Sequence, residues 1–167
     1  MKQEKLLVVQ MKADYSQLHK ENKYMTYKEE IRDLFSVPDD YYLAHCISSD
    51  FKMGKGIATE FVKRFDMKNK LISQYAQYDW RHKGYCLVCE KVFNLITKEF
   101  YYGKPTYQTL TEALWEMRDY VDRYDIKKIA MPTISSGLDR LNWDKVSEII
   151  KEVFEDTDVE ILVCKQK

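Results

Sequence analysis

The segment from Val92 to Lys98 restricts the possible folds most, because apolar residues occupy both of its faces. Successive side chains of an extended chain point in opposite directions, so Phe93 and Leu95 face one way while Val92 and Ile96 face the other. A strand that is apolar on both faces is buried on both sides. The sequence therefore predicts a sheet that is covered above and below.

Strand-like and helix-like segments alternate in the second half of the chain, which predicts a three-layer α/β/α domain. Apolar residues recur at the helical period in the predicted helices 56–65, 67–78, 106–122 and 143–154. Further strands are predicted over 5–12, 41–47, 85–89, 127–131 and 159–164. The segment 24–31 fits a strand, but its run Lys28-Glu29-Glu30 suits a helix equally well.

The composition indicates one globular domain. The chain has 167 residues, of which 45% are hydrophobic and 32% are charged. Its 27 basic and 27 acidic residues cancel, so no overall field attracts nucleic acid or an anionic membrane, although a local basic patch stays open. No stretch approaches the roughly 20 apolar residues of a membrane helix. The four cysteines are too few and too scattered for a disulfide scaffold, so we expect the cytoplasm.

Ligands of open α/β sheets bind beyond the carboxyl ends of the strands, and loops leave such ends at Ser48, Lys98 and Pro132. In the first loop, Gly54 and Gly56 stand just before a predicted helix, whose free N–H groups and positive dipole end suit a phosphate. A flexible turn is the plainer interpretation. The loop is not a Walker motif, which needs Gly-Lys-Ser/Thr at the helix start. It is not the dinucleotide fingerprint either, because Thr59 occupies the third glycine position.

The loop from Pro132 to Asp139 is also small and polar, and it also lies between a strand and a helix. Two such loops at one sheet edge could hold a diphosphate between them. The alternative is an ordinary connection in which Asp139 or Asn142 caps the next helix.

Lys98 ends the doubly buried strand and also has two interpretations. A lysine at a strand end is most often solvated. Alternatively it is a catalytic amine, since a neutral amine attacks carbonyl-like carbon. An ordinary lysine is almost wholly protonated at pH 7, so this role requires a site that favours the neutral form.

Other combinations of reactive residues do not make a site. Cys86 and Cys89 would lie about 10 Å apart on opposite faces of a strand, beyond the reach of a disulfide. His45 and Cys46 also face opposite sides, so they are not a catalytic dyad. We find no metal-ligand spacing and expect neither a metal nor a cofactor. The thirteen tyrosines are expected mainly to pack.

Six short runs, taken in order, resemble the macrodomain family. The first three runs resemble the beginning of a macrodomain sequence. They are Asp33-Leu34-Phe35, Leu43-Ala44-His45-Cys46-Ile47-Ser48 and Met53-Gly54-Lys55-Gly56-Ile57-Ala58. Three later runs resemble the terminal ADP-ribose protein glycohydrolase branch of this family. They are Leu95-Ile96-Thr97-Lys98, Lys104-Pro105-Thr106-Tyr107 and Gly137-Leu138-Asp139-Arg140-Leu141. The resemblance covers residues 33–163 with order and spacing kept. It implies a macrodomain over 24–167 with a central mixed, largely parallel sheet, and residues 1–23 would be an extension that adds an edge strand.

The resemblance also implies residue roles. Lys98 would be the nucleophile toward the anomeric carbon of the distal ribose, Asp139 its acid/base partner, and Asp33 the acceptor for the adenine amino group. Together with Asp33, the residues expected to bind ADP-ribose are Leu34, Ser48, Met53, Gly54, Lys55, Gly56, Ile57, Ala58, Pro132, Thr133, Ile134, Ser135, Ser136, Gly137 and Leu138.

The sequence departs from the family at a few positions. Arg32 stands where relatives commonly have glycine, and Ser135-Ser136 stands where they often have glycine. Cys164 stands where some relatives have an aromatic residue near the adenine, so adenine stacking, if present, would come from elsewhere.

The function implied is hydrolysis of single ADP-ribose units, linked to carboxylate side chains, in O-acyl-ADP-ribose or on a nucleic acid base. We expect a monomer that acts on modified protein, DNA or RNA and not on a membrane. The alternatives are a reader that binds ADP-ribose without turnover, a phosphatase for ADP-ribose phosphate, and an interaction domain with a vestigial pocket.

Overall fold

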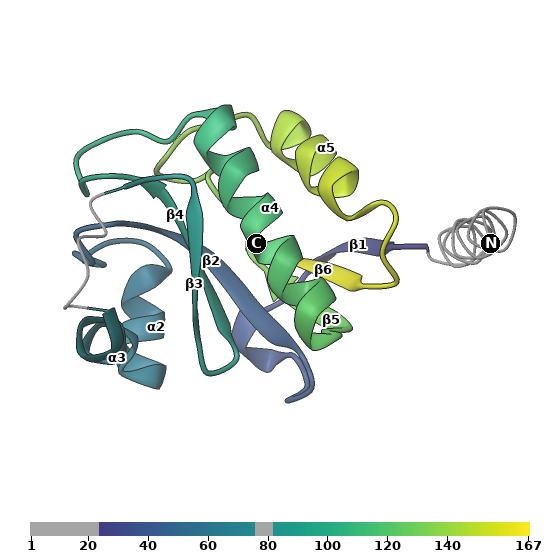
Figure 1. Ribbon diagram of the computed structural model, residues 1–167, viewed down its shortest axis with the longest axis horizontal. Coiled ribbons are helices and arrows are strands. Elements are labelled where there is room, and N and C mark those ends of the chain that lie inside the picture. Colours follow the sequence, from purple (N-terminus) through teal and green to yellow (C-terminus); the bar gives the residue numbers. More distant parts are fainter. Residues whose placement is uncertain (1–23, 76–81) are drawn as a thin grey trace, which may run out of the picture.

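A central sheet of six strands organises the described part of the chain, residues 24–75 and 82–167 of a computed structural model (Figure 1). The strand order is β1-β6-β5-β2-β4-β3. The strands are β1 (Thr26–Ile31), β2 (Tyr42–Ser48), β3 (Tyr85–Cys89), β4 (Val92–Lys98), β5 (Lys128–Met131) and β6 (Glu160–Lys165). All neighbours pair in parallel except β3 and β4. The sheet is mixed and largely parallel, as predicted.

Helices cover both faces of the sheet, which confirms the three-layer prediction. One face carries α4 (Tyr107–Tyr124) and α5 (Trp143–Phe154), and the other carries α2 (Ala58–Phe65), α3 (Met67–Tyr75) and the 3-10 turn η1 (Leu34–Ser36). Figure 1 shows α4 beside α5, with α2 and α3 grouped apart from them. No helix of the described ranges has the length and apolar character needed to cross a membrane.

The strand β4 is buried on both faces, as its sequence predicts. Phe93 and Leu95 pack into the core under α4 and α5, while Val92 and Ile96 pack into the core under α2 and α3. The same alternation separates Cys86, which lies in the first core, from Cys89, which lies in the second. The cysteine pair is therefore part of the packing.

The ambiguous segment 24–31 is a strand, because β1 pairs in parallel with β6. Its charged run Lys28-Glu29-Glu30 is exposed, which the edge position of β1 permits. The predicted strand over 5–12, the extension 1–23 and the predicted helical residues 76–78 lie outside the described residues.

The parallel strands bring their carboxyl ends to one edge of the sheet. Ser48 at the end of β2 is the register partner of Lys98 at the end of β4, after a local shift in the pairing. Strand β5 ends at Met131 on the other side of β2. The loops that follow β2, β4 and β5 therefore start side by side.

His45 belongs to the core. Its Nε2 lies 2.7 Å from Oδ1 of Asn94, and its ring stacks on Phe61 with centroids 3.8 Å apart. The Asn94 amide donates to the carbonyl oxygen of Leu87 at 3.2 Å, which fixes which end of the amide accepts. Burial lowers the pKa of His45 to about 4, so its ring is neutral at physiological pH.

Candidate functional site: a lysine–aspartate pair between two loops

Lys98 and Asp139 form an ion pair at the edge of the sheet. The distance from Nζ to Oδ1 is 2.9 Å, and the two side chains are only 17% and 15% exposed. Lys98 comes from the end of β4, and Asp139 comes from the loop between β5 and α5. The lysine is therefore not the solvated strand end of the plainer interpretation, since a surface lysine keeps its amine in water.

Asp139 does not cap a helix. The cap of α5 is Asn142, whose Oδ1 accepts the N–H of Lys145 at 3.2 Å. The sequence left the two residues as alternatives, and the structure assigns the cap to Asn142. The carboxylate of Asp139 is thereby available to Lys98.

The glycine-containing loop before α2 presents backbone N–H groups. In the part of the chain that the structure describes, the N–H groups of Gly54 to Ala58 find no protein acceptor, and Ile57 at the helix start provides no side-chain cap. Gly56 has a φ of +63°, a conformation that glycine adopts without strain. Free N–H groups at a helix N-terminus are suited to an anion such as phosphate.

The second loop touches the first. A Cβ at Gly56 would lie 3.2 Å from Cδ1 of Leu138, so these two residues meet across the site. Gly137 has open space beside its Cα, because no atom lies within 4 Å of the position that a Cβ would take there. The two loops predicted to hold a diphosphate are therefore in contact beside the Lys98–Asp139 pair.

The serines that replace glycine are accommodated within the second loop. Ser135 has a φ of 58°, and its hydroxyl donates to Sγ of Cys46 at 3.4 Å. The hydroxyl of Ser136 donates to the carbonyl oxygen of Ile134 at 3.2 Å. Burial raises the pKa of Cys46 to about 12, so this thiol beside the ion pair stays protonated.

Asp50 is a site residue that the sequence analysis missed. Its Oδ1 accepts the hydroxyl of Ser48 at 2.5 Å and the N–H of Lys52 at 3.1 Å, and its Oδ2 accepts the N–H of Tyr101 at 2.9 Å. Burial alone would raise the pKa of Asp50, but these hydrogen bonds and the charge of Lys98 lower it overall. The sequence signal that could have identified Asp50 is its position, since a carboxylate two residues after the end of β2 lies at the edge where ligands bind.

Asp33 lies at the same edge of the sheet but well away from Lys98. It caps η1, with Oδ1 accepting the N–H of Phe35 at 3.0 Å, while Leu34 is buried. Asp33 follows β1, and four strand spacings separate β1 from β4, or about 19 Å. A ligand that contacts both ends of this edge must be elongated.

Two residues that differ from the family pattern, Cys164 and Arg32, have structural contacts of their own. Cys164 lies within β6 and is buried in the core under α2 and α3. Arg32 donates through Nε to the hydroxyl of Ser36 at 3.1 Å, which ties the start of η1 to its end. Over residues 24–75 and 82–167, no group of three His, Cys, Asp or Glu side chains could hold a metal ion.

The sheet with its loops at the carboxyl edge defines the class of protein. The family model described as "Macro domain" matches residues 44–150, and the chain belongs to the macrodomain family. The resemblance seen in the sequence is thus confirmed.

The relatives of this chain include a human protein named "ADP-ribose glycohydrolase OARD1". It is 40% identical over 135 residues, which cover 78% of this chain and 86% of the relative. Among solved structures, the macrodomain of Thermus aquaticus DarG matches with a TM-score of 0.72 at 22% identity, over 84% of this chain and 98% of that one. Thermosipho africanus DarTG, solved in complex with ADP-ribose, matches with a TM-score of 0.63 at 16% identity, over 79% of this chain and 39% of that one. These structural matches support the fold.

Proposed function

We propose that the protein is an ADP-ribosyl hydrolase that releases single ADP-ribose units, with Lys98 as nucleophile and Asp139 as acid and base. The observation that carries this proposal is the shielded ion pair, 2.9 Å long, beside two loops that meet at Gly56 and Leu138. A module that only binds ADP-ribose needs neither a shielded amine nor its carboxylate. The name of the human relative, an ADP-ribose glycohydrolase, supports the same activity.

The ligand would lie along the carboxyl edge of the sheet. Asp33 would accept the adenine amino group, and the N–H groups of Gly54 to Ala58 would hold the diphosphate with help from the second loop. The distal ribose would then reach Lys98. ADP-ribose has the elongated shape that a separation of about 19 Å requires.

Attack on the anomeric carbon begins the reaction. The amine must be neutral to attack, and Asp139, whose Oδ1 lies 2.9 Å from Nζ, would take the proton from it. A bond forms from Nζ to the anomeric carbon, and the bond from that carbon to the acceptor oxygen breaks. The proton held by Asp139 passes to the leaving carboxylate.

Water completes the reaction. The ribose ring opens when the ring oxygen takes a proton from nitrogen, which gives a Schiff base between Nζ and the anomeric carbon. Water adds to this carbon while Asp139 accepts one of its protons, and Asp139 then returns that proton to Nζ. The carbon–nitrogen bond breaks as the new hydroxyl group becomes a carbonyl group and its proton also passes, through Asp139, to Nζ, and the ribose ring closes again. One water molecule is consumed, and ADP-ribose and the free acceptor are released.

The proposed substrates are esters of ADP-ribose with glutamate or aspartate side chains, and O-acyl-ADP-ribose, on which the protein would act as a deacylase. Each carries an acyloxy leaving group at the distal ribose. A nucleic acid base is a further acceptor. We also propose that the protein is a cytoplasmic monomer.

The test is release of ADP-ribose from a glutamate-modified protein. We expect Lys98→Ala and Asp139→Ala each to reduce the rate by about 100-fold or more, the scale on which positioned acid–base groups act. Lys128→Ala is a matched control, because Lys128 forms an ion pair with Asp40 of the same 2.9 Å length on the surface. It should keep the wild-type rate.

Trapping distinguishes the proposed intermediate from other mechanisms. Cyanoborohydride added during turnover should reduce the Schiff base and attach ADP-ribose to Lys98, seen by peptide mass spectrometry. Tight binding of ADP-ribose without release would instead indicate a reader. Phosphate release from ADP-ribose phosphate that does not depend on Lys98 would indicate a phosphatase.

A further inference from the structure

The loop between β2 and α2 holds two residues in a backbone conformation that favours glycine. Phe51 has a φ of 53° and Met53 has a φ of 49°, values at which a Cβ crowds the backbone. Both side chains are buried in the core under α2 and α3. Strain of this kind persists only where the surrounding structure holds the backbone in place, and it is concentrated at functional sites. Polar contacts around these two residues should therefore fix the loop.

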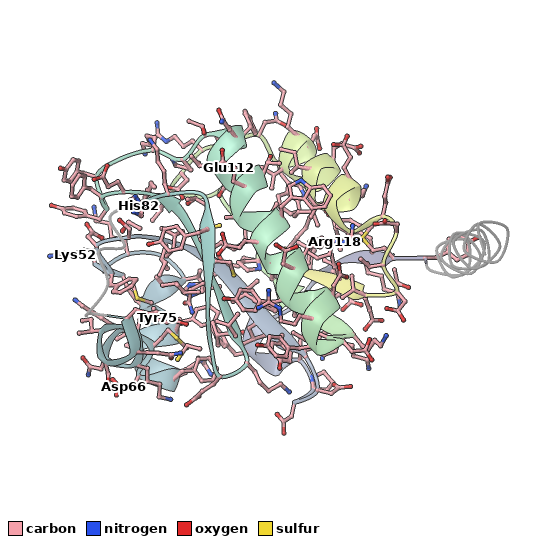
Figure 2. All side chains as sticks on the ribbon, viewed as in Figure 1. Lys52, Asp66, Tyr75, His82, Glu112 and Arg118 are labelled. Atoms are coloured by element: carbon pink, nitrogen blue, oxygen red, sulfur yellow. The ribbon has the colours of Figure 1, made fainter. Side chains whose placement is uncertain are left out.

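Asp50 provides such contacts through one carboxylate oxygen. Its Oδ1 accepts the hydroxyl of Ser48, ahead of the strained residues, and the N–H of Lys52, which lies between them. Lys52 is exposed, and Figure 2 shows its side chain at the outer edge of the molecule, so its backbone and not its amine meets Asp50. The N–H groups of residues 54–58 follow directly. Oδ1 of Asp50 thus fixes the start of the segment that would hold the diphosphate.

The other oxygen of the same carboxylate holds the segment that follows the candidate nucleophile. Oδ2 of Asp50 accepts the N–H of Tyr101 at 2.9 Å. The neighbouring residue, Ser49, adds two contacts to the same segment. Its N–H donates to the carbonyl oxygen of Lys98 at 3.0 Å, and its hydroxyl donates to the carbonyl oxygen of Glu99 at 2.7 Å. The loop before α2 is therefore fastened to the end of β4.

The end of β4 needs this support because its pairing with β2 is irregular there. Ile47 pairs with Ile96, but the next residue of β2, Ser48, pairs with Lys98, so the register shifts by one residue. An irregularity of this kind beside an active site changes the direction of the side chains that follow it. Regular sheet pairing thus stops just before the nucleophile, and the contacts of Ser49 and Asp50 continue in its place.

A residue that only made a turn would not use the second oxygen. In an Asx turn the side chain binds the N–H two residues further on, as Oδ1 of Asp50 does with Lys52. The contact of Oδ2 with Tyr101 spans 51 residues and joins two loops instead. Burial acts to raise the pKa of Asp50, but its hydrogen bonds and the charge of Lys98 lower it overall, so the ionised carboxylate accepts from all these donors at neutral pH.

We propose that Asp50 is a positioning residue that couples the anion-binding loop to the nucleophile. Oδ1 holds the loop whose N–H groups would bind the diphosphate, and Oδ2 holds the strand end that carries Lys98. The ligand and the nucleophile are thereby kept in a fixed relation, which an attack on the anomeric carbon requires. This inference rests on the proposed function, because it assigns Asp50 to the attack by Lys98.

Asp50→Asn separates the two contacts. The amide oxygen still accepts from Ser48 and Lys52, whereas the NH2 group that then faces the N–H of Tyr101 cannot accept. We expect kcat for release of ADP-ribose from a glutamate-modified protein to fall about 10-fold or more, because a small misplacement of the nucleophile is costly. Calorimetry should give a Kd of free ADP-ribose within about 2-fold of the wild type, since the loop contact is kept.

Asp50→Ala removes both contacts. It should lower kcat at least as much as Asp50→Asn does, and it should also weaken the binding of ADP-ribose by about 10-fold, because the strained loop is no longer held. Circular dichroism and urea unfolding show that each variant is folded under the conditions of the assays. A change in stability alone would not produce a loss of kcat without a loss of affinity in one variant and both losses in the other.

Glu29→Gln is the matched control. The carboxylate of Glu29 also has three partners, the hydroxyl of Tyr27 at 2.8 Å, Nε1 of Trp143 at 3.1 Å and Nζ of Lys165 at 2.7 Å. Burial acts to raise the pKa of Glu29, but its partners lower it overall, as in Asp50. Glu29 lies on β1, at the edge of the sheet away from β4. The control variant should keep the wild-type kcat and the wild-type Kd.

Three outcomes would overturn the role of Asp50. These are a wild-type kcat in Asp50→Asn, an equal loss of kcat in Glu29→Gln, or an unchanged Kd in Asp50→Ala. If the wild type releases ADP-ribose and Asp50→Asn does so equally fast, only the positioning role fails. If the wild type binds ADP-ribose but releases none from any substrate, the proposed hydrolase fails and Asp50 has no attack to position, whatever the Kd values show.

Discussion

The two glycines of the loop before α2 differ in what they tolerate. Gly56 has a positive φ of 63°, and a Cβ there would meet Leu138 at 3.2 Å. Gly54 has an ordinary φ, and the nearest atoms to an added Cβ lie 3.9 Å away. Although both belong to the same short motif, only Gly56 has a backbone conformation that favours glycine.

We therefore expect Gly56→Ala to lower the free energy of unfolding by about 1–2 kcal/mol, the cost of a side chain in the left-handed region. Urea unfolding measures this change. Gly54→Ala is the control and should stay within about 0.5 kcal/mol of the wild type. Equal losses in the two variants would show that the backbone conformation at Gly56 is not the cause.

The thiol of Cys46 should be unreactive although it lies beside the ion pair. With its pKa raised by burial to about 12, only about one molecule in 10⁴ is a thiolate at pH 8, roughly 1,000-fold less than for an ordinary cysteine. We expect N-ethylmaleimide to modify Cys46 slowly in the native protein and rapidly after unfolding. Peptide mass spectrometry over time gives both rates of modification. Fast modification of Cys46 in the native protein would contradict its raised pKa.

At the scale of elements, Asn142 and Asp139 illustrate the separation of structural and chemical roles in one loop. Asn142→Ala removes the cap of α5 and should lower the free energy of unfolding by about 1 kcal/mol while leaving kcat unchanged. Asp139→Asn keeps the shape but removes the carboxylate, so ADP-ribose release should fall by about 100-fold or more. Unfolding and release assays on both variants are the measurement. A loss of release in Asn142→Ala as large as in Asp139→Asn would remove the distinction.

Most elements could be predicted from the sequence because their apolar periodicity is strong. The strand β4 and the helix α4 begin and end within about two residues of expectation, since buried faces dictate both patterns. The strand β1 stayed ambiguous because it is an edge strand, and the exposed run Lys28-Glu29-Glu30 carries no burial pattern.

The site itself was only partly predictable. Lys98 and Asp139 are 41 residues apart, and their contact depends on the parallel order of β4, β2 and β5, which no local pattern records. The contact of Asp50 with the N–H of Tyr101 spans 51 residues and was not foreseen for the same reason. Residue types and loop positions indicated which groups carry chemistry, whereas the topology determined which of them meet.

For the whole molecule, the parallel sheet separates stability from function. The loops of the site gather at the carboxyl edge, while the buried pair His45–Asn94 lies within β2 and β4 under α2. A titration of His45 should therefore act on global stability. Because the pKa of His45 is lowered to about 4 in the folded protein, the unfolded chain takes up a proton at higher pH than the folded one does.

Stability should consequently fall as the pH falls from about 6.5 toward 4. With an unfolded pKa near 6.5, the free energy of unfolding should drop by about 2 kcal/mol between pH 7.5 and pH 5. The carboxylates whose pKa is lowered by hydrogen bonds, such as Asp50, lose their contribution only at lower pH. Burial raises the pKa of Glu116, and this carboxyl group acts in the opposite direction, because it favours the folded state as the pH falls. Urea unfolding at a series of pH values measures how the free energy of unfolding changes with pH.

His45→Gln is the test variant, because glutamine keeps a hydrogen-bonding group for Asn94 but does not titrate. It should flatten the slope of the free energy of unfolding against pH, whereas His82→Gln, at an exposed position, should retain that slope. An unchanged slope in His45→Gln would assign the pH dependence to other groups.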